Sequence, residues 1–156
     1  MKILLAIDGS TCSDAAIEEV ARRPWPTGSE VRIISVVDPP FVPATEPWAI
    51  SSTYLEDMVK ALHDKALLTV EGALLKLRMG VDKTLKLTTD LPTGYPGQVI
   101  VDEAEGWGAD LIVVGSHGYG AWSRFLLGSV SNAVATHAKC SVEIVRCPQA
   151  SEREKK

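Results

Sequence analysis

The stretch Asp110-Leu-Ile-Val-Val-Gly-Ser-His-Gly118 joins a buried-strand pattern to a glycine-rich turn. Nine residues follow, and Gly128-Ser-Val-Ser131 then begins a pattern typical of a helix. From Gly115 to Ser129 the spacing is Gly-x2-Gly-x9-Gly-Ser. Glycine lets the backbone bend tightly and approach a ligand, and unpaired N–H groups at the start of a helix attract anions. The stretch therefore predicts a cradle for phosphate groups.

Outward from this stretch, apolar runs of strand length alternate with segments of helical periodicity. Alternation of this kind, with fully apolar central strands, predicts a parallel sheet covered by helices on both faces. The predicted fold is α/β: a Rossmann-like, doubly wound sheet of five parallel strands in the order 3-2-1-4-5. We expect strands over 3–7, 31–37, 83–89, 111–114 and 142–145, and helices over 13–23, 53–79, 95–107 and 129–139.

Composition limits the class of protein. The chain has 156 residues, is 46% hydrophobic and carries a net charge of -4, which predicts a single soluble domain over 1–147 and argues against nonspecific nucleic-acid binding. We expect a flexible charged tail over 148–156. No signal peptide or apolar run long enough to cross a bilayer is evident. The three cysteines form no CxxC pair and are odd in number, so we expect no disulfide framework and a cytoplasmic location.

Asp8 and Val36 are the candidate ligands of a nucleoside. Asp8 ends the first predicted strand, where its carboxylate would accept hydrogen bonds from both ribose hydroxyls. The alternative is that Asp8 only closes a turn with Gly9 or caps the next helix. Val36, near the end of the second predicted strand, would line an apolar slot for adenine; the alternative is a place in the sheet core.

Phosphate donors are expected in the glycine-rich stretch. Four successive residues would offer backbone N–H groups, and the start of the last helix would add N–H and hydroxyl donors. These residues are Gly115, Ser116, His117, Gly118, Gly128, Ser129 and Ser131. The alternative is structural: Gly115 ends a strand and Ser129 is an ordinary N-cap. Arg124 would fold over the phosphates or be a solvated surface residue.

Several classes of site are absent from the sequence. There is no GxxxxGK[ST] loop, no GxGxxG fingerprint in the first turn and no GxSxG elbow. His117 has no metal-ligating residue at a suitable spacing beside it. We therefore predict a site that binds a nucleotide, with no catalytic residues and no protein metal site.

With these motifs, the chain resembles a universal stress protein of the ATP-binding kind over residues 2 to about 146. The family signature Gly-x2-Gly-x9-Gly-[Ser/Thr] is matched without a gap. Further matches are the stretches 7–10, 94–100, 109–118 and 141–145. The resemblance implies an adenine nucleotide alpha hydrolase-like fold, an adenine-nucleotide site and a homodimer.

The resemblance also implies a role for each matching residue. Asp8 corresponds to the ribose ligand, Val36 to an adenine contact, and Ala6 and Ile7 to adenine neighbours through their backbones. The phosphate segment corresponds to Gly115, Ser116, His117, Gly118, Gly128, Ser129, Val130 and Ser131.

The predicted edge strand supplies a separate argument for a dimer. Its sequence Ser141-Val-Glu-Ile-Val-Arg146 is partly apolar, and exposed edges of this kind tend to be paired or covered. Pairing with the same strand of a second copy would give a two-fold homodimer through 141–147.

The predicted function is a stress-response regulatory protein that binds ATP, ADP or AMP, with Mg²⁺ as a possible companion of the phosphates. The alternatives are a slow ATPase or autophosphorylating protein with Ser129 or Ser131 as acceptor, and a nucleotide-free dimeric interaction module. A thiol-based redox sensor using Cys140 or Cys147 is a further alternative.

Overall fold

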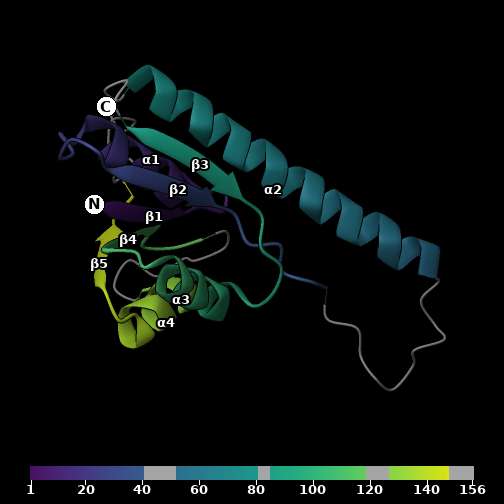
Figure 1. Cartoon of the computed structure of the whole chain (residues 1–156). Helices are drawn as coiled ribbons and strands as arrows, with labels where there is room; N and C mark the ends of the chain where they lie inside the picture. The colour runs from purple at the N-terminus through teal and green to yellow at the C-terminus, as the bar shows by residue number, and fades with distance from the viewer. Residues whose placement is uncertain (41–51, 81–84, 119–126, 148–156) are drawn as a thin grey trace, which may run out of the picture.

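The computed structural model describes residues 1–40, 52–80, 85–118 and 127–147. Arg124 and the expected tail over 148–156 lie outside these described residues. Within them the chain forms five strands and four helices that alternate along the sequence (Figure 1). The bounds are β1 Lys2–Ala6, α1 Thr11–Arg22, β2 Glu30–Ile34, α2 Ser52–Gly80, β3 Lys86–Asp90, α3 Pro96–Trp107, β4 Leu111–Gly115, α4 Ser129–His137 and β5 Ser141–Val145.

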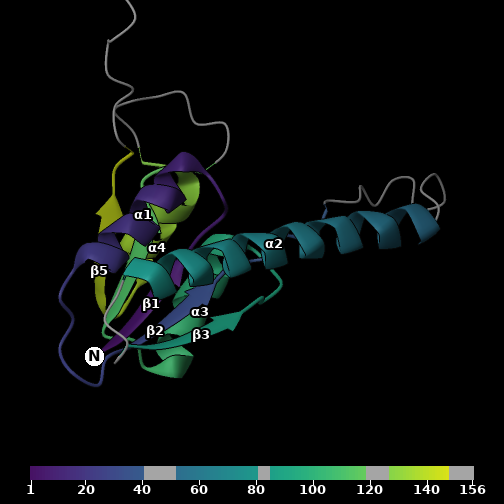
Figure 2. The ribbon, with the colours of Figure 1, turned by 90° about the horizontal axis from the view of Figure 1, so that it is seen from above.

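The five strands form one parallel sheet in the order β3-β2-β1-β4-β5. The predicted α/β fold and strand order are confirmed. Helices α1 and α2 cover one face of the sheet, and α3 and α4 cover the other (Figures 1 and 2). The connections after β1 and β4 therefore lead to helices on opposite faces, which makes the carboxyl ends of these neighbouring strands the topological switch point.

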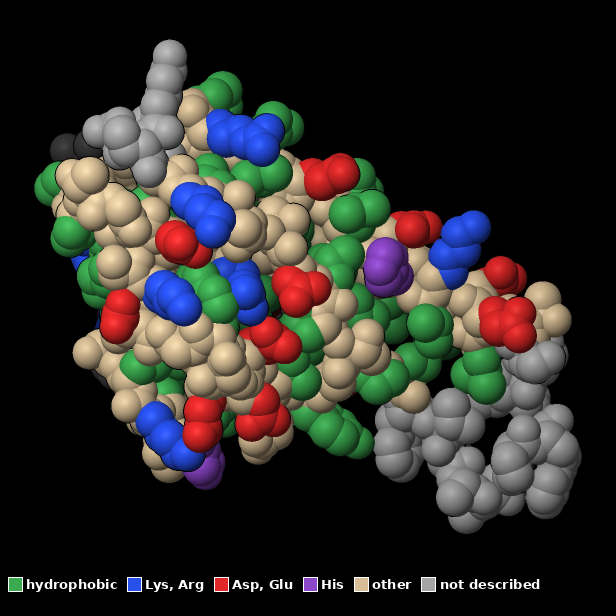
Figure 3. Space-filling model, in the orientation of Figure 1, with side chains coloured by type: hydrophobic (Ala, Val, Ile, Leu, Met, Phe, Trp, Pro, Cys, Tyr) green, Lys and Arg blue, Asp and Glu red, His purple; other side chains and the backbone are tan. Residues whose placement is uncertain are grey.

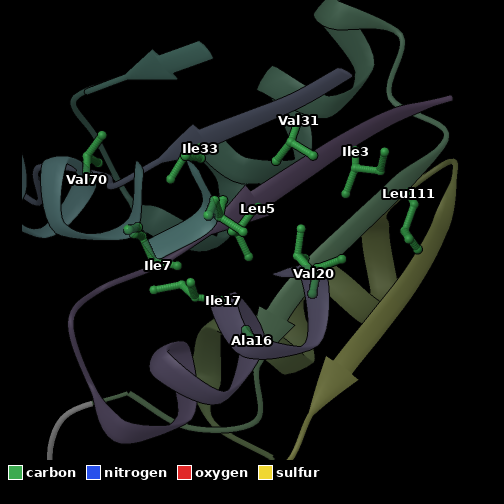
Figure 4. Packing of buried hydrophobic residues seen from close by; sticks show 13 residues of the cluster. Ile3, Leu5, Ile7, Ala16, Ile17, Val20, Val31, Ile33, Val70 and Leu111 are labelled. Atoms are coloured by element: carbon green, nitrogen blue, oxygen red, sulfur yellow. The ribbon is translucent and has the colours of Figure 1, made fainter. Parts of the chain in front are cut away.

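Side chains along each strand point alternately to the two faces of the sheet, so a hydrophobic core forms between the sheet and the helices on each face. Ile3 and Leu5 of β1 point toward α1 and α2, whereas Leu4 and Ala6 pack toward α3 and α4. On the first side, Ala16, Ile17 and Val20 of α1 project onto the strands (Figure 4). The central strands are thus buried on both faces, which explains their continuous apolar sequence.

Two strand boundaries differ from the predictions by three residues, and the others differ by at most one. The second strand ends at Ile34 rather than at residue 37, and Val37 instead forms an isolated parallel bridge with Thr93. The third strand is β3 over Lys86–Asp90, three residues later at its start than predicted. The sequence predicted a longer strand because its apolar pattern continues to Val37. Val37 is indeed buried, at 4% exposure, but it lies outside the regular hydrogen bonding of β2.

Helix α2 extends well beyond the sheet (Figure 1). Its later half is anchored by buried Ala66, Val70 and Leu77. Apolar side chains also remain on its outer surface, among them Leu68 and Leu75, with charged residues of both signs between them (Figure 3). None of the helices in the described part of the chain has the length and hydropathy needed to span a membrane.

A disulfide joins Cys12 in the first turn of α1 to Cys147, two residues beyond β5. Their Cα atoms lie 4.4 Å apart, although 135 positions separate them in the sequence. The expectation of no disulfide framework is therefore wrong for this pair. Cys140 is a free cysteine.

An ionic cluster fastens the end of α1 to the edge strand. Both terminal nitrogens of Arg23 donate to the Glu143 carboxylate at 2.7 Å, and Arg23 also bonds to Glu19. The hydrogen bond from Arg23 lowers the pKa of Glu19, and that to Glu143 raises the pKa of Arg23. Since Glu143 and Arg23 are 26% and 34% exposed, water screens this pair only in part.

Replacing Glu143 by glutamine removes the charge at nearly constant size. We expect Glu143→Gln to lower the free energy of unfolding by about 1 kcal/mol, the upper range for partly exposed pairs, as measured by urea denaturation. The control is Lys139→Gln, which breaks the more exposed Lys139–Glu105 pair and should change stability by less than about 0.5 kcal/mol. Equal losses from the two variants would contradict this assignment.

Candidate functional site

A pocket of about 300 Å³ lies at the carboxyl ends of β1 and β4. Of the predicted site residues that the structure describes, all except Ser116 line it, and five further described residues do so that the sequence analysis missed. The predicted ones are Ala6, Ile7, Asp8, Val36, Gly115, His117, Gly118, Gly128, Ser129, Val130 and Ser131; the others are Ser13, Ile34, Pro96, Ile100 and Val114. Residues far apart in the sequence thus converge at the switch point.

A larger hollow of about 480 Å³ is a weaker candidate for a site. Its described lining residues, from Leu55 to His63, come from the first turns of α2. A wall built from one helix does not bring polar groups together from different elements, as binding sites usually do. We therefore take the pocket at the carboxyl ends of β1 and β4 as the candidate functional site.

Asp8 belongs to a tight turn that starts α1. Its Oδ1 accepts the Ser10 N–H at 2.9 Å, and Gly9 has φ +84°, a conformation that favours glycine. Asp8 therefore closes the turn through one of its oxygens, as one alternative predicted. It does not cap α1, because the N-cap is Ser10. The carboxylate is exposed, and Oδ2 points toward Gly118, where an added Cβ would lie 2.6 Å from it. One carboxylate oxygen thus faces the pocket.

The first turn of helix α4 also lines the pocket. Its N-cap is Gly128, and Asn132 N–H is bonded to the Gly128 carbonyl at 2.9 Å. The first N–H groups of a helix lack intrahelical acceptors, which leaves those of Ser129, Val130 and Ser131 for other partners. The alternative that Ser129 is the N-cap is wrong, because Ser129 is the first helical residue, and it is exposed.

Ser116 lies behind the pocket, and its N–H is not offered to a ligand. That N–H donates to the Val145 carbonyl at 2.7 Å, because the bonding between β4 and β5 continues one residue past β4. The Ser116 carbonyl accepts the Gly128 N–H and the Ser131 hydroxyl, both at 2.9 Å. Ser116 and Ser131 are each 3% exposed. The predicted donor roles of the Ser116 N–H and the Ser131 hydroxyl are therefore replaced by a framework role.

The motif glycines are needed for space rather than for an unusual backbone conformation. Positive φ values occur among the described glycines only at Gly9, Gly28, Gly94 and Gly108, outside the motif. A Cβ at Gly115 would lie 2.7 Å from the Cys12 carbonyl carbon. One at Gly128 would lie 3.3 Å from the Ser116 oxygen. The signature thus marks positions where two backbones approach closely.

The remaining wall of the pocket is apolar. Val36 is half-buried there, together with Ile34 and Ile100. Val37, the neighbouring residue, is buried in the core instead. Pro96 also contributes, at the first helical position of α3, where the turn of sequence Gly94-Tyr-Pro-Gly97 leads into the helix. The pattern Gly-Tyr-Pro-Gly was the available signal for this wall.

The pocket can therefore bind a molecule with three chemically different parts. The apolar wall suits a flat ring system, the Asp8 carboxylate suits hydroxyl donors, and the start of α4 suits an anion. Of the lining residues, His117 also contributes an imidazole ring, whose Nδ1 lies 3.1 Å from the Ser116 hydroxyl. The geometry is that of a binding site.

Comparison with known proteins places these features in a family. The universal stress protein family model matches residues 1–146. Universal stress protein MJ0531 of Methanocaldococcus jannaschii is 34% identical over 151 residues, which cover 95% of this chain and 83% of that protein.

Solved structures have the same fold. That of the hypothetical protein MJ0577 superimposes with a TM-score of 0.80 at 26% identity, covering 96% and 97% of the two chains. A universal stress protein family member from Arabidopsis thaliana with AMP bound gives 0.66 at 20% identity, covering 96% and 93%. A universal stress protein in complex with cAMP gives 0.59 at 22%, covering 95% and 98%. On this combined sequence and structural likeness, the chain belongs to the universal stress protein family.

Proposed function

We propose that this protein binds an adenine nucleotide, ATP, ADP or AMP, and acts as a regulatory protein in the stress response. The observation that carries the proposal is the combination of groups that line one pocket: an apolar wall, the Asp8 carboxylate and the start of a helix. An adenosine phosphate presents three matching parts, a ring, two ribose hydroxyls and an anion. The AMP and cAMP held by two structurally similar proteins support the same class of ligand.

Each part of the nucleotide has fitting residues in the pocket. Val36 and Ile100 would flank adenine, and the free oxygen of Asp8 would accept a ribose hydroxyl. Gly118 and the N–H groups at the start of α4 would face the phosphates. Asp8 excludes the reverse orientation, since phosphate beside a carboxylate would be repelled.

Charge balance favours Mg²⁺ with the longer nucleotides. The described lining residues include no lysine or arginine, whereas ATP carries several negative charges. Arg124, outside the described residues, is the cation expected from the sequence. We also propose the cytoplasmic location that the sequence analysis expected.

The first test is the nucleotide itself. Denaturing the purified protein should release an adenine nucleotide detectable by mass spectrometry, and calorimetry with ATP and Mg²⁺ should give one site per chain. Asp8→Asn keeps an oxygen for the Ser10 N–H but loses the charge, so we expect Kd to rise by about tenfold or more. The control is Asp14→Asn, an equal charge change at a residue paired with Lys76 outside the pocket. A flat titration with parent protein from which no nucleotide is released on denaturation would refute nucleotide binding.

Two serines in the first turn of α4 should have different roles: Ser129 contacts the ligand, and Ser131 stabilises the fold. Ser129→Ala removes an exposed hydroxyl, so we expect weaker ATP binding with unchanged stability. Ser131→Ala removes a buried hydroxyl that bonds to Ser116 and Gly128, and we expect it to lower the free energy of unfolding by about 1–2 kcal/mol. Thermal unfolding and calorimetry of both variants measure the two effects. Identical behaviour of the two variants would refute the division.

We further propose a homodimer through 141–147. β5 is an edge of the sheet, and Val142, Ile144 and Val145 are half-buried apolar residues on it. Light scattering at micromolar concentration should give the dimer mass. Ile144→Lys places a charge on the edge, a device that opposes strand pairing, and should give monomers. The control Asn132→Lys adds the same charge at an exposed site on α4 and should leave the dimer intact. A monomeric parent protein would refute the dimer.

A further inference from the structure

The disulfide lies next to the pocket rather than at a distant edge. Cys12 is the second helical residue of α1, whose N-cap is Ser10. Cys147 follows β5 by two residues, and its sulfur turns toward α1 to meet Cys12. The bond therefore connects the start of α1 to the end of the edge strand, across the strand that carries the glycine motif.

Cys12 contacts that motif directly. Its backbone is the group that a Cβ at Gly115 would strike, at 2.7 Å. Its sulfur accepts a hydrogen bond from the Ser116 hydroxyl at 3.8 Å. The Ser116 carbonyl in turn holds Gly128 and Ser131 at the start of α4. A chain of packed groups thus runs from the disulfide to the proposed phosphate end of the site.

The backbone N–H of Ser116 is bonded to β5, the strand that leads to Cys147. The Ser116 N–H donates to Val145 of β5 at 2.7 Å. Cys147 continues directly from this strand, so its bond to Cys12 limits how far the end of β5 can move from α1. The turn over 115–118 is therefore held between two elements that the disulfide joins.

We propose that Cys12 and Cys147 are a redox modification site, and that their reversible disulfide orders the turn over 115–118 and tightens nucleotide binding. The link to affinity rests on the proposed function. The co-reactant would be a low-molecular-weight thiol or disulfide of the glutathione type. Disulfides in a reducing cytoplasm are usually transient, catalytic or redox-sensing, which agrees with reversibility.

Exposure determines which sulfur reacts first. Cys12 is 3% exposed, whereas Cys147 is half-buried, so a small thiolate would reach Cys147. Its attack forms a mixed disulfide on Cys147, and the electron pair of the broken S–S bond leaves on Cys12 as a thiolate. The helix N-terminus and the Ser116 hydroxyl both favour a thiolate at Cys12.

A second small thiol then completes the reduction. It displaces Cys147 from the mixed disulfide and forms one small disulfide. In total two small thiols give up two electrons and two protons, and both cysteines become thiols. Oxidation of the pair by a small disulfide is the exact reverse.

Cys140 provides an internal control thiol. It is a free, half-buried cysteine that follows α4, and burial raises the pKa of its thiol. A raised pKa leaves less thiolate at neutral pH, so Cys140 should react slowly. Cys140→Ser should therefore leave the redox behaviour of the protein unchanged.

The experiment compares oxidised and reduced full-length protein, prepared in oxidised or reduced glutathione. Mass spectrometry should show the Cys12–Cys147 bond in the first and free thiols in the second. Hydrogen exchange of the peptide over 111–118, without nucleotide, should be slower in the oxidised form. Calorimetry should give an ATP affinity at least about fivefold higher for the oxidised form. Cys147→Ser should match the reduced form under both conditions, and Cys140→Ser should match the parent.

The outcomes separate the two proposals. Failure to form the bond, or equal exchange in both forms, would overturn the redox inference while leaving nucleotide binding intact. Equal ATP affinity in both forms would overturn its effect on the site. If neither form binds ATP but exchange over 111–118 still differs, the nucleotide proposal fails and ordering of the turn by the disulfide stands.

Discussion

The close packing of Gly115, the last residue of β4, against the first turn of α1 is the constraint on which the site depends. With any side chain at this position, a Cβ would lie 2.7 Å from the backbone of Cys12. Because glycine allows the approach, the Ser10 hydroxyl reaches the His117 carbonyl at 3.3 Å. The turns that follow β1 and β4 are thereby fastened to each other, and the pocket forms over their junction.

Serines build the floor of this junction. Ser10, Ser13, Ser116 and Ser131 are each at most 5% exposed, and each takes part in hydrogen bonds with neighbouring backbone or side chains. Backbone groups at the ends of strands and helices need such partners once they are buried, since an unpaired buried polar group is costly. Serine provides these hydrogen-bond partners with a small side chain. Polar residues beside a glycine motif are therefore not all ligands, and exposure is what distinguishes Ser129 from the others.

The order of strands, and the meeting of most predicted site residues at one pocket, followed from the sequence because both depend on local patterns: strand-length apolar runs, and turns rich in glycine. The roles of Ser116 and Ser131 did not, since they depend on where β5 pairs and how α4 begins. The Cys12–Cys147 pair was missed for a similar reason. The sequence analysis considered only the spacing of cysteines along the chain. These two lie 135 positions apart in the sequence and meet because α1 packs over β4 and β5. The apolar wall at Ile34 and Ile100 likewise arises from the contact of β2 with α3.

The two ends of the pocket differ in how firmly they are built. The apolar end rests on residues of the sheet core, such as Ile34 at 0% and Ile100 at 3% exposure. The other end is held mainly by single hydrogen bonds to Ser116 and by the packing of Cys12. Single hydrogen bonds contribute roughly 0.5–1.5 kcal/mol each, so modest changes at this end alter its order while the core stays intact. The nucleotides of the proposed function share adenine and ribose and differ in their phosphates, so the proposal assigns regulation and discrimination among them to this more adjustable end.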